Sequence, residues 1–453
     1  MLGFFTSQES KMRRNAGNWL EVADKVWATR RDVLPAPEAR DLVRLRDELR
    51  KGLKTRADAG KLKLQIESLE EALKRSGGTV YPKTTLVDYV EFLVVAAIVI
   101  LGIRTYFVQP FKIPTNSMWP SYYGMTDVNY LPNKPVPGPA ESAFRFLTLG
   151  AQRYQMVAPA DGELSVLVIV RDHYVQGRPA GKGADFLAST RKSGRSWLVL
   201  PADLREYTFF VDGVPATVDV PADFGSGPDE RAGGFDDLFV QSWFGSWENY
   251  REYCAKALPG SQAETFTYDA ATGMQGVAYR LHTGRYVHKG DPLIRFDILT
   301  GDQLFVDRFS YHFFPPKPGD GFVFRTDNIP QLQKADYFIK RLVGVPGDTI
   351  SIDPPYVIRN GAHITGARAF ELNQNRVPPY TGYTREYPTP DWWNLFLPDD
   401  KQITVPYRHY FAMGDNSSNS EDSRYWGLVN GDDVIGRPLF VYFPFTRRWG
   451  PAH

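Results

Sequence analysis

The spacing of apolar residues predicts helices in the first part of the chain. From about residue 9 to residue 78, apolar positions recur every three or four residues with charged residues between them. This period is that of an amphipathic helix or of a short coiled-coil seam. Pro35 and Pro37 interrupt it. We therefore expect residues 1–80 to form a cytoplasmic helical region, either a hairpin that packs on itself or a helix that binds a partner.

A long apolar run follows at residues 86–108. Its strictly uncharged part, residues 92–103, is shorter than the roughly 20 residues that a spanning helix needs, so a buried core helix is one interpretation. The run is apolar on all sides, however, and therefore has no amphipathic stripe. Glu91 and Arg104 flank the uncharged part, where their side chains can reach a membrane interface, and aromatic residues lie near both ends. These features favour a transmembrane helix.

The long middle section, residues 125–297, shows short strand-like runs between turns and no helical period. The clearest runs are residues 164–170, 196–200 and 207–211. Residues 157–164 and 283–294 resemble the two hairpins of a lipoyl-like barrel-sandwich hybrid. The lysine motif that carries lipoate is absent, so such a module would be structural. An irregular β-rich insertion is the alternative.

Strand-like runs also fill the last third of the chain, where Pro and Gly mark the turns. The runs are residues 322–324, 338–345, 349–352, 408–413 and 439–443. Pro346-Gly347-Asp348 predicts a tight turn, because Pro fixes φ and Gly accepts a positive φ.

Charge and cysteine content narrow the class of protein. The formal net charge of the 453 residues is +1, which argues against a general nucleic-acid binder. The single cysteine, Cys254, excludes an intrachain disulfide, and no Cys/His cluster has zinc spacing. We therefore expect no metal or other cofactor, and an inert Cys254 thiol. The N-terminus lacks the order of a cleaved signal peptide, and its basic residues favour a cytoplasmic N-terminus, with the chain after Val108 outside.

Ser117 is the first candidate for chemistry, because it lies between prolines just after the apolar run. A serine nucleophile needs a base. His409 is one candidate, although a packed or surface histidine is an equally ordinary interpretation. Lys340 is the other, in the middle of an apolar strand. Such a lysine either points to solvent or is buried, and burial would lower its pKa so that the neutral amine could accept the serine proton.

Residues 414–427 form a second loop of interest, rich in acidic and hydroxyl side chains between glycines. The spacing does not match an EF-hand calcium loop. A structural turn held by Asp–Arg pairs is the other interpretation.

Four separated stretches together resemble one family, the bacterial type I signal peptidases. These are Ser/Lys membrane proteases that remove signal peptides. Residues 109–121 (QPFKIPTNSMWPS) resemble the nucleophile box, 301–306 (GDQLFV) a strand box, 337–348 (YFIKRLVGVPGD) the lysine box and 414–427 the C-terminal box. The four occur in the family's order after a membrane segment, which makes the resemblance specific. It covers residues 86–124 and 298–445.

The resemblance implies a role for each matching residue. Ser117 corresponds to the nucleophile and Lys340 to the general base. The Thr115 hydroxyl corresponds to an oxyanion-hole donor that acts with the Ser117 N–H, and Ser420 to a hydroxyl that orients the lysine. A supporting ion-pair network corresponds to Arg341, Asp415, Asp422 and Arg424. Small pockets for an Ala-x-Ala-like cleavage site correspond to Ile113, Pro114, Met118 and Ile339.

The chain also departs from the family pattern. Ser417-Ser418 stand where many relatives have an Arg–Asp pair, and Ser121 stands where Thr is common. After Gly124 the chain enters the insertion, where relatives continue into a strand. The departures leave the two dyad positions untouched.

Together these features predict a mainly β protein with a signal-peptidase-like folded sheet. The catalytic domain is expected at residues 109–124 and 298–453, after one transmembrane helix at 86–108. The expected partners are preprotein signal peptides and the lipid bilayer. The expected location is the bacterial inner (cytoplasmic) membrane, with the catalytic domain on the periplasmic side. The alternatives are a catalytically idle membrane-anchored scaffold and another Ser/Lys protease of similar fold, such as a self-cleaving repressor.

Overall fold

The chain divides into two compact units, Met1–Gly102 and Ile103–His453. A computed structural model describes residues 8–452. The exceptions are residues 84, 132–133, 176–177, 197–199, 226–233, 260, 331, 333–335, 386–396 and 398–401.

Three helices pack together in the described part of the first unit. They are α1 (Gln8–Arg30), α2 (Ala36–Lys54) and α3 (Ala59–Ser76), and their apolar sides share one buried core. The described residues pack on themselves, as expected, but as three helices and not as a hairpin. Pro35 precedes α2, as predicted from the break in the pattern, but a second break follows at Arg56, where φ is +52°. Asp58 then caps α3 by accepting a hydrogen bond from the Lys61 N–H at 2.9 Å.

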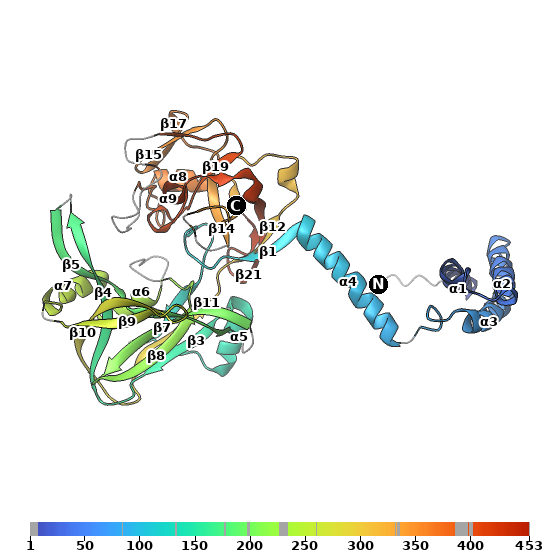
Figure 1. The fold of residues 1–453 in the computed structure, drawn as a ribbon, viewed down its shortest axis with the longest axis horizontal. Coiled ribbons are helices and arrows are strands. Elements are labelled where there is room, and N and C mark those ends of the chain that lie inside the picture. Colours follow the sequence, from blue (N-terminus) through green and yellow to red (C-terminus); the bar gives the residue numbers. More distant parts are fainter. Residues whose placement is uncertain are drawn as a thin grey trace. The chain divides into compact units, whose positions relative to one another are not determined.

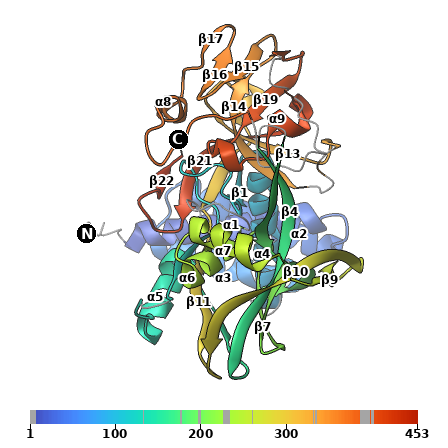
Figure 2. The same ribbon diagram turned by 90° about the vertical axis from the view of Figure 1, so that its left-hand side faces the viewer.

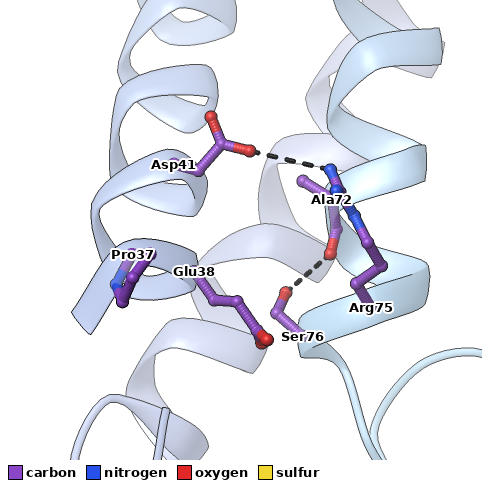
Figure 3. A pocket seen from close by; sticks show the side chains of 6 residues that line it. All are labelled: Pro37, Glu38, Asp41, Ala72, Arg75 and Ser76. Carbon is purple, nitrogen blue, oxygen red and sulfur yellow. Dashed lines mark hydrogen bonds and ion pairs between the residues drawn. The ribbon is translucent and has the colours of Figure 1, made fainter. Parts of the chain in front are cut away.

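A small pocket lies between α2 and α3 (Figure 3). Arg75 and Asp41 form an ion pair across it at 3.8 Å. The Ser76 hydroxyl donates to the Ala72 carbonyl at 2.8 Å within α3. These polar groups are engaged in helix packing.

Helix α4 (Thr85–Tyr106) contains the apolar run and leads into β1 (Val108–Lys112) (Figure 1). Among the described residues it is the one helix long and apolar enough to cross a membrane, and none of its most apolar window is buried. The interpretation as a buried core helix was therefore wrong.

An antiparallel sheet in the second unit carries Lys340 and, in its edge strand β1 (Val108–Lys112), the segment that precedes Ser117. Its strands follow one another in the order β1, β12 (Gln303–Asp307), β21 (Val434–Phe443), β13 (Gly321–Arg325), β14 (Tyr337–Gly344), β19 (His409–Met413) and β20 (Val429–Asn430), with β22 (Gly450–Pro451) on β21. The strands expected around residues 322, 338, 408 and 439 are confirmed. The sheet brings the segment before Ser117 and the strand of Lys340 into one layer.

A smaller sheet extends from the end of β14. It contains β17 (Ala362–His363), β16 (Tyr356–Arg359), β15 (Thr349–Asp353) and β18 (Ile403–Thr404). Along the chain, α8 (Arg368–Gln374) lies between β17 and β18, and α9 (Ser423–Trp426) comes after β18. The turn predicted between β14 and β15 is present. Gly347 has a φ of +92° there, and the Asp348 N–H donates to the Val345 carbonyl at 3.0 Å.

The insertion has its own core and its own sheets (Figure 2). One sheet contains β5 (Arg178–Leu187), β4 (Gly162–Val175), β10 (Met274–Val287), β9 (Ala263–Asp269), β6 (Ser189–Ser196), β7 (Leu200–Val211) and β8 (Val214–Pro221) in that order. A further β4–β7 pairing closes a ring. The other sheet is β2 (Thr126–Asn129), β11 (Pro292–Leu299) and β3 (Gln152–Val157). Of the strand expected at 196–200, residues 197–199 lie outside the described part.

The structure places the two turns of the barrel-sandwich resemblance side by side. The Ala158 N–H donates to the Asp291 carbonyl, and the Gly290 N–H donates to the Ala158 carbonyl, both at 2.9 Å. Lys289 donates its backbone N–H to the Asp161 carboxylate at 2.8 Å.

The expectation of no helix in the insertion was wrong. The described residues there include α5 (Pro139–Leu149), α6 (Phe235–Trp243) and α7 (Trp247–Ala257). Helix α6 buries its polar as well as its apolar residues, so its sequence shows no apolar stripe opposite a polar one. Asp236 accepts the Leu187 N–H at 2.7 Å, and Asp237 accepts the indole N–H of Trp247. None of the residues of α5 is fully buried.

The insertion leaves and re-enters the catalytic sheet at one place. The Asp302 N–H donates to the Tyr123 carbonyl and the Ile113 N–H donates to the Asp302 carbonyl, both at 2.8 Å. Gly301 is packed so closely that an added Cβ would lie 1.9 Å from the Ile113 oxygen and 3.0 Å from the carbonyl carbon of Gly124. Both ends of the insertion therefore touch the segment that carries Ser117.

Candidate active site

Ser117 and Lys340 meet in the structure. Ser117 lies on the turn that follows β1, and Lys340 lies on β14. The Lys340 Nζ donates to the Ser117 Oγ at 2.6 Å. Lys340 is only 3% exposed, whereas Ser117 is half-buried. This is the separation that a proton transfer between the two groups requires.

Burial sets the protonation state of the Lys340 amine. Desolvation lowers the pKa of Lys340 from 10.5 to about 8, although the negative charges of Asp422, Glu421 and Asp415 oppose the change. In the part of the chain that the structure describes, Lys340 forms no ion pair within 4 Å. Its close partner is a neutral hydroxyl, so a large fraction of the amine is unprotonated near pH 8.

Asn116 holds the turn that presents Ser117. Its side-chain oxygen accepts the Gly124 N–H at 2.8 Å, and its amide nitrogen donates to the Met125 carbonyl at 3.1 Å. Its own carbonyl accepts the Trp119 N–H at 3.0 Å. The side chain thus ties the turn to the first residues of the insertion. Sequence reasoning assigned Asn116 no role, because its partners lie eight and nine residues further along the chain.

The loop at 414–427 holds the other side of the same turn. The Asn416 N–H donates to the Ser117 carbonyl at 3.1 Å, and the Asn416 side chain donates to the Asn116 carbonyl at 3.2 Å. Gly414 lies against both segments: an added Cβ would be 2.4 Å from the Ser117 oxygen and 2.1 Å from the Ser420 Oγ. Only glycine fits there, so Gly414 and Asn416 join the residues that position Ser117.

Thr115 and Ser420 differ in exposure. Thr115 is exposed, two residues before Ser117. Ser420 is completely buried, and its Oγ makes no hydrogen bond to any described residue.

Two buried ion pairs support the loop. Arg341 donates to Asp415 through Nε at 2.8 Å and through Nη2 at 2.6 Å, and its Nη1 donates to the Gly319 carbonyl at 2.8 Å. Arg424 pairs with Asp422 at 2.8 Å. All four side chains are buried.

Arg424 is the centre around which the loop folds. Its Nη2 donates to the carbonyls of Ser417 and Ser420 at 2.7 and 3.0 Å, and its partner Asp422 accepts the Gly414 N–H at 3.0 Å. The Ser417 hydroxyl accepts from Arg424 at 3.1 Å. Ser417, one of the departures from the family pattern, is therefore built into this network.

Three of the four expected pocket residues belong to one apolar cluster or pack against it. Ile113 and Met118 are buried in it, and the half-buried Ile339 packs against it. Pro114 is half-buried. Ile339 and Pro114 are therefore the more accessible of the four.

Asp302 is a further anchor that sequence reasoning missed. The completely buried carboxylate accepts the Tyr123 N–H at 2.9 Å and a bidentate pair from Arg448 at 2.9 and 2.8 Å. Arg448 also lies over the Tyr123 ring, 3.6 Å from its centroid. The last residues of the chain are thus tied to the end of the nucleophile turn.

His409 and Cys254 have ordinary structural settings. A ring nitrogen of His409 lies 2.9 Å from the Tyr407 carbonyl on the same segment. The Cys254 thiol is buried, which raises its pKa to about 12. In the described part of the chain, no group of three or more His, Cys, Asp or Glu side chains could hold a metal ion.

Comparison with known proteins gives consistent matches. The family model "Signal peptidase, peptidase S26" matches residues 295–443. Signal peptidase I of Leptolyngbya laminosa is 30% identical over 177 residues, 38% of this chain and 74% of that protein. Signal peptidase I P of Bacillus subtilis subsp. natto is 31% identical, over 33% of this chain and 71% of that protein. The chain belongs to the signal peptidase I family.

This membership makes the chain a serine endopeptidase of the signal-peptide-removing type. A protein of Synechocystis sp., named "Probable signal peptidase I-1", is 34% identical over 33% of this chain and 66% of its own length. A crystal structure of a signal peptidase I from Enterococcus faecalis aligns with 27% of this chain at 25% identity, with a TM-score of 0.19, too low to bear on the fold. The matched family region contains Lys340 and the 414–427 loop, and the insertion before residue 295 lies outside it.

Proposed function

We propose that the chain is a membrane-anchored peptidase that removes N-terminal signal peptides from preproteins with Ser117 as nucleophile and Lys340 as general base. The observation that carries this assignment is the 2.6 Å contact between Ser117 Oγ and a buried lysine whose pKa is lowered to about 8. An amine in that state can accept a serine proton near neutral pH.

The two residues account for every proton in the reaction. Neutral Lys340 takes the proton of Ser117 as Oγ attacks the carbonyl carbon before the scissile bond. The tetrahedral intermediate collapses, the peptide C–N bond breaks, and the Lys340 ammonium protonates the leaving amine. Water then attacks the acyl ester, Lys340 takes its proton and returns it to Ser117, and the signal peptide leaves with a free carboxylate.

The neighbouring residues supply binding and orientation. Thr115 and the Ser117 N–H are proposed to donate to the oxyanion, which carries charge only in the intermediate and its transition states. Ser420, buried beside Gly414, is proposed to orient the Lys340 amine. Arg341, Asp415, Asp422 and Arg424 keep the loop in place.

Substrate selection follows from the cluster beside Ser117. Ile339 and Pro114 would contact small substrate residues directly, while Ile113 and Met118 would form the pocket floor. Pockets with such walls favour the small side chains of an Ala-x-Ala-like site.

The anchor is α4. We propose that it crosses a bacterial cytoplasmic membrane once, with the N-terminus inside and the second unit on the outer side. The substrate is then a peptide whose apolar segment lies in the same bilayer.

The assignment is tested by Ser117→Ala and Lys340→Ala in the full chain, assayed on a preprotein in detergent. Each variant should lose about 10³-fold or more of its processing rate. Ser418→Ala, a half-buried serine of the neighbouring loop, and Lys289→Ala, an exposed lysine of the insertion, are matched controls. Retained processing by either dyad variant would contradict the mechanism and would favour the alternative of a catalytically idle scaffold.

A further inference from the structure

Glu421 is an acidic residue beside the dyad to which the mechanism gives no role. It lies between Ser420 and Asp422 in the 414–427 loop, and both of these neighbours are completely buried. Glu421 itself is half-buried, and it forms no hydrogen bond or ion pair with any residue that the structure describes. A carboxylate in this setting loses part of its hydration, which is costly unless a nearby charge compensates for the loss.

The loop brings Glu421 close to the nucleophile turn. Gly414 packs against the Ser117 carbonyl and the Ser420 side chain so tightly that neither contact leaves room for a Cβ. The Gly414 N–H also donates to the Asp422 carboxylate at 3.0 Å. The residues on both sides of Glu421 are therefore packed on Gly414, which in turn lies against the turn that carries the nucleophile.

The charges of Lys340 and Glu421 act on each other. Desolvation lowers the pKa of Lys340, whereas the negative charges of Asp422 and Glu421 raise it. Desolvation raises the pKa of Glu421, the positive charge of Lys340 lowers it, and the negative charge of Asp422 raises it. The ammonium form of Lys340 and the carboxylate form of Glu421 thus stabilise each other.

The other charges that act on Lys340 are already paired. They belong to Asp422, Arg424 and Asp415. Asp422 pairs with Arg424 at 2.8 Å, and Asp415 pairs with Arg341 at 2.6 Å. Among the described residues that act on Lys340, Glu421 is therefore the acid whose charge no cation neutralises at close range.

We propose that Glu421 is a positioning residue whose carboxylate stabilises the Lys340 ammonium as that ion forms. The inference rests on the proposed Ser117–Lys340 dyad. During the attack, Ser117 Oγ bonds to the substrate carbonyl carbon while its proton moves to Lys340 Nζ. Positive charge thus appears on the amine in the transition state, where a fixed negative charge lowers the barrier. The acid of a Ser-His-Asp triad stabilises the imidazolium ion in the same manner.

This role has opposite consequences at low and at high pH. A carboxylate that stabilises the ammonium keeps the resting amine protonated up to a higher pH, which slows the reaction at low pH. The same carboxylate makes the neutral amine a stronger base, which speeds the reaction once the pH is high enough to free that amine. Removal of the charge should therefore raise the rate on the acid side of the wild-type midpoint and lower it on the alkaline side.

The test is Glu421→Gln in the full chain, which removes the charge and keeps the size of the side chain. We expect the midpoint of kcat/KM against pH, measured on a soluble peptide in detergent from pH 6 to pH 10, to fall by about one pH unit. The plateau above the midpoint should fall about threefold, and the rate at pH 6 should rise about threefold. The midpoint does not depend on how much of the variant folds, because misfolding scales every rate equally.

Two further variants serve as controls. Glu421→Asp keeps the charge and should keep a midpoint close to that of the wild type. Glu371→Gln, at an exposed glutamate of α8, removes the same charge elsewhere in the catalytic domain and should leave the whole profile unchanged.

An unchanged midpoint in Glu421→Gln overturns the proposal. Rates lowered by the same factor at every pH would mark a structural role, and a rise in KM alone would mark a contact with substrate. Failure of the dyad itself would be seen elsewhere, as a flat profile of the unaltered chain or as retained processing by Lys340→Ala. With the dyad intact in both of these measurements, an unchanged midpoint counts against Glu421 alone.

Discussion

The two faces of strand β14 give a buried cation different partners and shift its pKa in opposite directions. Lys340 and Arg341 are neighbours in sequence and are equally buried, but alternation along a strand sends them to opposite sides. Lys340 meets the neutral hydroxyl of Ser117, and burial lowers its pKa to about 8. Arg341 meets the carboxylate of Asp415 in a bidentate pair, which raises its pKa.

The difference shows that burial alone does not make a base. Both cations lose water, yet only the one without a close anion becomes easier to deprotonate. The arginine, whose partner is charged, instead joins the 414–427 loop to the sheet. One strand thus supplies a reactive side chain and the rigid support next to it.

Removing the anion from the Arg341 face should have the largest effect on stability. Asp415→Asn leaves a buried guanidinium without its counter-charge, so the free energy of unfolding should fall by about 3–5 kcal/mol. Denaturant unfolding measures this change. Asp432→Asn breaks the exposed pair with Arg408 and should cost less than about 1 kcal/mol. Equal effects of the two substitutions would contradict the contrast between the faces.

Removing the cation from the Lys340 face should instead raise the free energy of unfolding. Lys340→Met should be inactive, but it no longer buries a charge. A lysine pKa of about 8 in the folded chain against 10.5 in the unfolded chain corresponds to a gain of at most roughly 3 kcal/mol in the free energy of unfolding. The gain should be complete below pH 8 and should vanish as the pH rises to 10.5, because only the unfolded wild-type chain binds the proton in that window. Unfolding of both chains at pH 7 and pH 10.5 measures it. A variant less stable than wild type at pH 7 would contradict the prediction.

The pH dependence of activity follows from the same group. If neutral Lys340 is the base, kcat/KM should rise about tenfold per pH unit below pH 8 and level off above it. Initial rates on a soluble peptide in detergent, from pH 6 to pH 10, give this profile. A profile that is flat across pH 8 would show that another step or group limits the reaction.

Asn116 offers a smaller test that leaves the dyad itself intact. Asn116→Ala removes both side-chain bonds that hold the turn and should lower kcat by roughly 10-fold to 100-fold with little change in KM. Asn116→Asp keeps the acceptor for the Gly124 N–H and should lie between wild type and alanine. Asn375→Ala, at the exposed asparagine that caps the C-terminus of α8, is the control. A change in KM alone would argue against a positioning role.

The sequence predicted what depends on local pattern. The apolar period located α4 and most strands of the catalytic sheet, and Pro346-Gly347 located the turn after β14. The resemblance to a family singled out Ser117 and Lys340, which the fold then places 2.6 Å apart. A lysine in an apolar strand could not by itself reveal which way it pointed.

Features that depend on long-range contacts could not be read in the same way. Asp302 and Arg448 are 146 positions apart, and Asn116 and Asn416 are 300 apart. Nothing in either local sequence signals the other. Helix α6 escaped notice for a related reason: its two aspartates are buried by partners from elsewhere in the insertion, which erases the usual stripe.

The close approach of Gly124 and Gly301 bears on how such a chain could arise. Since the two glycines are already packed together, a large module can be acquired or shed between them by a single recombination event, without moving the residues on either side. Joining Gly124 directly to Gly301 would yield a shortened protease whose ends meet where they already touch. The catalytic sheet of this chain thus has one site of insertion, seven residues after the proposed nucleophile.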